Sequence, residues 1–193
     1  MRKKMTVLCL AILLVGGMSF AQATKRPLDK GTFNVGGSIS FSSSSGDFYG
    51  DDAISTFALA PSARYFIIDG LAVGVDLLLN TESEGNYTDT TIGIGPVVAY
   101  MFDVNSPTLY PYVGAGVAIG SNKHSRSGAY SYENTTSAFI FKFAGGVAFM
   151  VKPNLAVLAE LGYSVESYKG EDWDKSEGGG TFSFSVGLSA FIK

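Results

Sequence analysis

The stretch Thr181–Lys193, TFSFSVGLSAFIK, decides the fold. Its residues alternate, with Phe182, Phe184, Val186, Leu188, Ala190 and Ile192 on one face and Ser183, Ser185, Gly187 and Ser189 on the other. A period of two is typical of a β-strand with one apolar face. An apolar strand at the end of a chain would be an exposed edge unless another strand pairs with it. We expect the first strand to be that partner, which would close a barrel.

The same alternation recurs along the chain. Seven more strands are predicted, at about Thr32–Ser43, Ile54–Ile67, Leu71–Thr81, Thr90–Phe102, Leu109–Gly120, Ala138–Met150 and Leu155–Ser167. Eight such strands predict an all-β fold, a closed antiparallel up-and-down transmembrane β-barrel. Pro61, Pro96 and Pro111 fall inside strands, where each removes a ladder donor, and we expect bulges there.

The connections between these strands alternate in length. Three are short: Ile68–Gly70, Asp103–Thr108 and Lys152–Asn154. Four are longer and polar: Ser43–Ala53, Glu82–Asp89, Asn122–Thr135 and Ser167–Gly180. Outer-membrane barrels have short periplasmic turns and long extracellular loops. The pattern therefore predicts an outer-membrane barrel of a Gram-negative-type cell with both termini in the periplasm.

The first 23 residues have the pattern of a cleaved secretory signal. Basic residues at positions 2–4 precede the apolar run Met5–Met18, and Ala21-Gln22-Ala23 is an A-x-A cleavage site, with cleavage after Ala21 as the alternative. Cleavage after Ala23 leaves 193 − 23 = 170 residues, predicted to be one barrel domain, 24–193. The single cysteine, Cys9, lies in the signal, so the mature chain offers no disulfide or thiolate metal ligand.

The charge balance of the mature chain is acidic. Removing the three bases of the signal leaves 14 − 3 = 11 basic against 17 acidic residues, a net charge of −6. This balance argues against a nucleic-acid partner. The expected partners are outer-membrane lipid, the barrel assembly machinery and extracellular molecules that contact the loops.

The two faces of the strands predict which side meets lipid. An eight-stranded barrel has a narrow interior, which suits Gly, Ala and Ser, whereas Phe, Leu, Val and Ile would face hydrocarbon. Four charges lie in mid-strand, Arg64, Asp76, Lys142 and Glu160, and all fall on the small-residue face. We expect two structural ion pairs in a plugged lumen, Arg64 with Asp76 and Lys142 with Glu160, because buried charges pair. Joining Arg64 to Asp76 requires an odd-numbered turn at Asp69-Gly70, and Lys142 and Glu160 should lie opposite or one diagonal step apart. A gated proton or ion path is the alternative role.

The run Leu109–Gly120, LYPYVGAGVAIG, the closing strand and these four charges resemble the small eight-stranded outer-membrane barrels related to OmpX and the OmpA membrane domain. The resemblance covers nearly all of the mature chain. Barrels of this kind often end on an aromatic residue that resembles an assembly signal, whereas here Phe191 is followed by Ile192 and Lys193.

Few residues suggest catalysis or metal binding. His124, the single histidine, lies beside Ser125 in a predicted loop without the fixed geometry of a nucleophile and its base. The run Glu171–Asp174 offers oxygen ligands but matches no defined calcium loop. We therefore expect no enzyme, no cofactor and no metal site.

Aromatic residues gather near both ends of the predicted strands. They are Phe48, Tyr49, Tyr87, Tyr130, Tyr132, Tyr168 and Trp173 at the long loops, and Tyr65, Tyr100 and Phe102 at the short turns. Two interfacial girdles are the first interpretation, and loop anchors for a partner are the second. The expected function is a structural or surface-interaction role. The alternatives are a narrow channel or lateral path for small or apolar solutes, a lipid-modifying enzyme, and a soluble lipocalin-like barrel.

Overall fold

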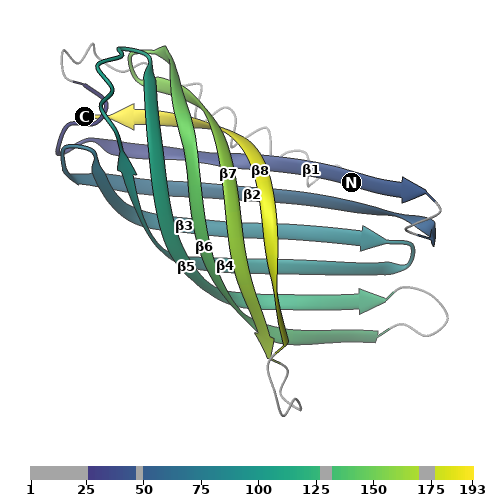
Figure 1. Ribbon diagram of the computed structural model, residues 1–193. Coiled ribbons are helices and arrows are strands. Elements are labelled where there is room, and N and C mark those ends of the chain that lie inside the picture. The colour runs from purple at the N-terminus through teal and green to yellow at the C-terminus, as the bar shows by residue number, and fades with distance from the viewer. Residues whose placement is uncertain (1–25, 47–49, 127–131, 170–176) are drawn as a thin grey trace.

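The computed structural model describes residues 26–46, 50–126, 132–169 and 177–193, and the predicted signal lies outside these ranges. Eight strands follow one another in a closed antiparallel ring (Figure 1): β1 (Phe33–Gly46), β2 (Gly50–Ile68), β3 (Leu71–Glu84), β4 (Tyr87–Met101), β5 (Leu109–Arg126), β6 (Tyr132–Lys152), β7 (Leu155–Lys169) and β8 (Glu177–Ile192). The predicted barrel and the pairing of the closing strand with the first are confirmed. Over the same ranges, no helix has the length and apolar character needed to cross a membrane.

The register of the ladders fixes the stagger of the barrel. From Phe33 the partners run through Tyr65, Val73, Val98, Ala115, Phe143 and Tyr163 to Phe182 on β8. The direct partner of Phe33 across the closure is Ile192. The shear is therefore 192 − 182 = 10 residues, and strands in such a barrel tilt by ~35–45°.

The barrel has two distinct rims. The terminal rim carries residues 26–32, Asp69-Gly70, residues 102–108, Pro153-Asn154 and the end of β8. The hairpin rim carries the other ends of the strands, where β1 and β2, β3 and β4, β5 and β6, and β7 and β8 are joined.

The predicted contrast between short and long connections is wrong. The expected loop Glu82–Asp89 is a two-residue hairpin turn, because Glu84 pairs with Tyr87 and only Gly85 and Asn86 lie between the strands. Gly85 has φ of 53°, the positive value that the first central position of a type II′ turn requires. The expected loops 43–53, 122–135 and 167–180 are also largely strand, apart from residues 47–49, 127–131 and 170–176, which lie outside the described ranges. Hydrogen-bonded ladders continue past the apolar residues, so polarity does not mark their end.

Bulges occur, but not at the prolines. The register shifts between Ser44 and Gly46, Phe66 and Ile68, and Met150 and Lys152. Between β2 and β3, Ala60 and Pro61 form no ladder pairs, but the pairs on either side of them keep the same register. The ladders at Pro96 and Pro111 keep their register as well, so the bulges expected at the three prolines are wrong. A missing N–H removes one bond at most and leaves the neighbouring pairs in place.

The outward faces form one apolar belt. Exposed outward side chains include Val75, Ile94, Ile119, Phe139 and Phe182. The belt ends at the same height on these strands. The next outward residue towards the hairpin rim, two positions beyond the last apolar one, is a serine, threonine or glycine: Ser55, Thr81, Thr90, Ser121, Ser137, Ser167 and Gly180. On β5 the belt runs from Leu109 to Ile119, ten residues along a tilted strand, or ~25 Å of height. That height matches the apolar band of outer-membrane barrels, ~25 Å.

The N-terminal described residues fold across the terminal rim. Leu28 is buried, and its carbonyl accepts a hydrogen bond from the backbone N–H of Gly70 at 2.9 Å. Asp29 accepts a hydrogen bond from Lys193 at 2.8 Å, so the two ends of the barrel domain are tied together. The Lys193 hydrogen bond holds the pKa of Asp29 below its ordinary value of 3.8.

We expect this tie to weaken in acid. A carboxyl group whose pKa is lower in the folded state stabilises the fold at pH values above its unfolded pKa. That stabilisation is lost as pH falls through the folded pKa, which for Asp29 lies below about 4. Asp29→Asn should therefore lower the thermal midpoint at pH 7 by about 2–4 °C, the effect of ~1 kcal/mol for a partly exposed pair. As pH falls below about 4, the difference between the variant and the wild type should shrink, as followed by heat-modifiable gel mobility. Equal midpoints at pH 7 would contradict the tie.

Candidate functional site: the barrel lumen

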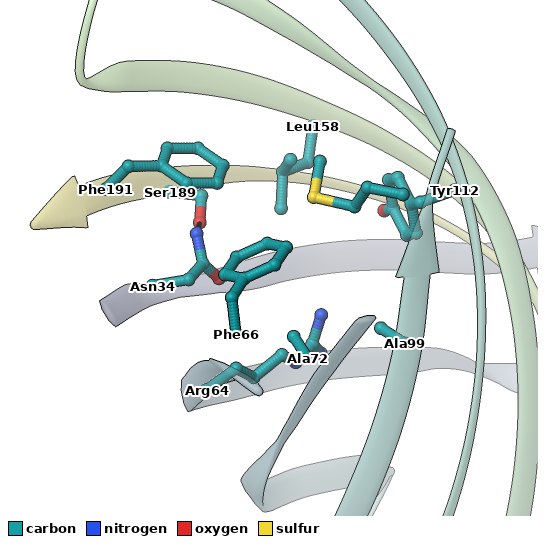
Figure 2. A pocket seen from close by; sticks show the side chains of 10 residues that line it. Asn34, Arg64, Phe66, Ala72, Ala99, Tyr112, Leu158, Ser189 and Phe191 are labelled. Carbon is teal, nitrogen blue, oxygen red and sulfur yellow. Dashed lines mark hydrogen bonds between the residues drawn. The ribbon is translucent and has the colours of Figure 1, made fainter. Parts of the chain in front are cut away.

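An apolar cluster closes the lumen at the terminal rim. Phe66 and Phe191 face each other from β2 and β8, with ring centroids 6.3 Å apart (Figure 2). Around them lie the buried residues Leu28, Ala72, Met101, Tyr110, Tyr112, Ala148, Met150 and Ala156. A cavity of about 20 Å³ remains between this cluster, Arg64 and Asn34, enough for one water molecule. Asn34 donates a hydrogen bond to Ser189 at 2.5 Å across the β1–β8 closure.

A layer of charge lies above this cluster. One guanidinium nitrogen of Arg64 lies 3.2 Å from both carboxylate oxygens of Asp76. Lys142 Nζ lies 2.7 Å from Glu160 Oε1, and the hydroxyl of Tyr112 donates to Glu160 Oε2 at 3.0 Å. Two cations and two anions thus neutralise one another in the interior.

The register explains how the two pairs meet. Arg64 lies opposite Gly74, one diagonal step from Asp76. The bulge at Ile67 leaves five residues between the paired Phe66 and Ala72, and this odd number lets both charged side chains point inward, as predicted. The predicted spacing of the second pair is wrong. Lys142 lies opposite Ser164 and Glu160 opposite Gly146, two diagonal steps apart. The long lysine side chain spans that offset.

Breaking the second pair should cost stability. Lys142→Met leaves Glu160, whose side chain is 14% exposed, with Tyr112 as its remaining partner. We expect the free energy of unfolding to fall by about 2–3 kcal/mol, less than the ~3–5 kcal/mol of a fully buried pair because a cavity adjoins it. The double variant K142M/E160M should recover at least half of that loss, measured by urea unfolding in vesicles. Lys123→Met removes the exposed pair with Glu133 and should cost under ~1 kcal/mol; a K142M loss no larger than this would refute the role.

Above the charge layer the lumen is open. A cavity of about 930 Å³ extends towards the hairpin rim, lined by short polar side chains such as Ser40, Thr56 and Asn80 together with apolar ones such as Ala58, Val97 and Ile140. The sequence predicts a narrow interior filled with side chains. The cavity shows that the half of the lumen towards the hairpin rim is not filled. Glycine, alanine and serine side chains are too small to meet across the ring.

The mouth of this cavity carries a hydrogen-bonded cluster. His124 Nδ1 lies 2.6 Å from Asp89, and Nε2 lies 2.9 Å from the hydroxyl of Tyr132. The ring of Tyr87 stacks on His124 with centroids 5.8 Å apart, and the Arg126 guanidinium lies over Tyr87. The sequence indicates His124 as a candidate site residue and Tyr87 and Tyr132 as loop aromatics, but Asp89 and Arg126 were missed. The partners of His124 come from three neighbouring strands that continue through segments predicted to be loops.

This geometry separates His124 from Ser125. The two are successive residues of β5 and point to opposite faces, and Ser125 donates to the backbone carbonyl of Thr88. Within the described ranges no group of three His, Cys, Asp or Glu side chains is placed to hold a metal ion. The acidic run Glu171–Asp174 lies outside those ranges.

The aromatic interpretation is corrected at one rim. Tyr87, Tyr132 and Tyr168 belong to the mouth of the lumen, where Tyr168 donates to Glu166 at 2.6 Å, and are not part of a lipid-facing girdle. Phe48, Tyr49, Tyr130 and Trp173 lie outside the described residues. At the terminal rim Tyr65, Tyr100 and Phe102 are exposed and outward, as an interfacial girdle requires. Phe33 joins them, with its ring 4.9 Å from that of Tyr65.

The closure between β1 and β8 covers only part of the barrel's height. Its ladder runs for seven pairs, from Phe33–Ile192 to Ile39–Val186, and within the described parts of both strands no pair follows. The ladder of β1 with β2 instead continues to Gly46–Gly50, and that of β7 with β8 to Tyr168–Glu177. Figure 1 shows β8 (yellow) curving away from β1 towards the hairpin rim. We call this gap, between Ser40–Gly46 and Glu177–Ser185, the seam.

An apolar belt around a closed ring, with charges paired inside, defines an outer-membrane β-barrel protein. The chain matches the outer membrane protein beta-barrel domain family over residues 7–189, nearly its whole length, and it belongs to that family. It is an outer-membrane protein. No curated protein matches the sequence.

Two solved structures with TM-scores above 0.5 share the fold, and a third is similar at a lower score. Neisserial surface protein A is 23% identical, with a TM-score of 0.54 over 82% of this chain and 94% of that chain. The translocator domain of the autotransporter NalP from Neisseria meningitidis is 14% identical, with a TM-score of 0.51 over 97% and 68%. OprG from Pseudomonas aeruginosa is 14% identical, with a TM-score of 0.49 over 87% and 99%. At these identities the likeness concerns the fold alone.

Proposed function

We propose that the protein is a non-conducting outer-membrane anchor that presents its hairpin rim to the outside. The observation that carries this proposal is the closure at the terminal rim, where Phe66, Phe191 and Leu28 pack beneath the layer of paired charges. A solute in the large cavity would have to displace both layers to pass through. The terminal rim would face the periplasm, in keeping with the predicted signal, and barrel assembly machinery would insert the chain.

The hairpins would carry the surface interaction. Their strands continue beyond the apolar belt, as β5 does from Ile119 to Arg126, so they stand above the lipid as a stiff sheet. Rigid strands lower the entropy cost of binding an extracellular partner. We propose no catalysis, because Ser125 and His124 point to opposite faces.

Conductance in planar bilayers tests the closure. We expect the purified protein to show no steady openings. Phe66→Ala and Leu28→Ala combined with Lys142→Ala should disrupt both layers and produce them, whereas the belt substitution Phe139→Ala should leave the traces silent. Reproducible openings of the wild-type protein would contradict the proposal. Heat-modifiable mobility of each variant confirms that the barrel has folded.

A lateral path for apolar solutes is the second candidate. The seam favours it, because a ladder of seven pairs leaves the hairpin half of the β1–β8 boundary without main-chain closure. Such a path would join the lumen to the lipid and would need no passage through the terminal rim.

A further inference from the structure

The seam lies at the depth of hydrocarbon. Its last paired outward residues are Ile39 and Val186, yet the apolar face of β8 continues past them through Phe184 and Phe182, which are 61% and 71% exposed. The belt ends only at Gly180. Unpaired backbone N–H and C=O groups at this depth are strongly unfavourable because lipid tails offer no hydrogen bonds. An occupant of the seam must therefore supply hydrogen bonds as well as apolar surface.

The inner side of the seam opens into the large cavity. Ser38 and Ser40 of β1 and Thr181, Ser183 and Ser185 of β8 are among the residues that line this cavity of about 930 Å³. The seam thus joins an apolar outer surface to a hydroxyl-rich interior. A molecule with one apolar part and one hydrogen-bonding part matches both sides.

The charges of the cavity select the polar part. Its cations are already paired, Arg64 with Asp76 and Lys142 with Glu160. Glu82 and Glu166 also line the cavity, and their hydrogen bonds come from the hydroxyls of Thr56, Ser164 and Tyr168. Asp89 adds a third carboxylate beside His124. An anionic group entering here would meet surplus negative charge, whereas an alcohol or ammonium would not.

We propose that the seam is the entrance of a binding site for single-chain amphiphiles whose head is uncharged or cationic. The alkyl chain lies against Phe182 and Phe184, and the head enters the lumen beside Ser40, Ser183 and Ser185. This inference deepens the lateral-path candidate and names its ligand class. It does not depend on the non-conducting role of the terminal rim.

Photo-cross-linking maps the site. The probes are diazirine-bearing alkyl chains of equal length that end in an alcohol, an amine or a carboxylate, added to the protein in phospholipid vesicles. We expect the alcohol and the amine to label residues 39–46 and 177–186 at least tenfold more than the β4–β5 boundary, and the carboxylate to show no such preference. Uniform labelling around the belt would overturn the site, and a preference for the carboxylate would overturn the head-group assignment.

A cysteine lock tests the entrance. Continuing the β1–β8 register beyond Ile39–Val186 pairs Ser40 with Ser185, so a disulfide in S40C/S185C would close the seam. The matched control S40C/A58C joins the same β1 residue to its existing partner on β2. Oxidation should reduce seam labelling at least tenfold in the first variant and leave it unchanged in the control.

The site would be rejected if labelling of the seam stayed unchanged after the intramolecular disulfide had formed. It would also be rejected if the disulfide failed to form and the probe labelled only residues outside the seam. Disulfide-linked dimers would reject it as well, because they would assign the seam to a second copy of the chain. Bilayer conductance of the same variants is read separately. Silent traces without seam labelling would reject this site and leave the anchor role standing.

Discussion

Leu77→Arg is expected to be the most damaging single change in the belt. Leu77 points outward from β3 near the middle of the apolar band and is 42% exposed to the surroundings of the barrel. An arginine there would place its guanidinium in hydrocarbon, at a cost of about 2–4 kcal/mol near the bilayer midplane. Urea unfolding of vesicle-inserted protein should show that loss, together with a lower yield of the folded band.

The neighbouring residue provides the control. Leu78 is the same residue type on the same strand but points to the opposite face, towards the lumen, and is less exposed than Leu77. The cavity has room for an arginine and carries surplus carboxylates, so Leu78→Arg should cost less than ~1 kcal/mol. Similar losses for the two variants would contradict the assignment of lipid and lumen faces.

Gly187→Val should prevent closure of the barrel. A Cβ at Gly187 would lie 2.4 Å from the backbone carbonyl oxygen of Gly37, across the short β1–β8 ladder. Backbone cannot withdraw as a flexible side chain can, and only seven pairs hold the two strands together. We expect loss of the heat-modifiable folded form or a loss above ~3 kcal/mol, beyond ordinary core overpacking.

Ser185→Val is the matched control for this closure. Ser185 lies two residues away on the same face of β8, just beyond the end of the ladder. A branched side chain there meets the seam and not the backbone of β1, so folding should persist. Equal damage from both substitutions would show that β-branching on this face, and not the close approach, is the cause.

Alternation was sufficient to predict the barrel because a lipid-facing strand obeys a strict period of two. That rule correctly placed Phe139, Phe143 and Phe182 on the outer face, where all three are exposed. It also placed the four paired charges on the inner face. The ends of the strands could not be predicted in the same way. Beyond the belt, water covers both faces, so residues such as Thr88 and Asp89 extend the ladder without any apolar period.

The mouth cluster and the seam were missed for related reasons. Asp89, His124 and Tyr132 meet because β4, β5 and β6 continue past the belt. Extending the predicted strand Thr90–Phe102 back through the β-branched Thr88 would have brought Asp89 into it. The seam depends on how far two strands distant in sequence remain paired. Ser40 and Ser185 continue the local pattern on both strands, so nothing in either segment indicates that pairing stops.

The most direct test is a nitroxide scan of β3 from Val73 to Leu79 in vesicles. The mature chain is predicted to lack cysteine, so each position can be labelled singly. We predict a period of two, with oxygen, which partitions into lipid, reaching labels at Val73, Val75, Leu77 and Leu79, and with labels at Asp76 and Leu78 shielded from it. The reverse pattern, with Leu78 open to lipid-soluble oxygen and Leu77 shielded, would contradict the barrel's inside-out arrangement.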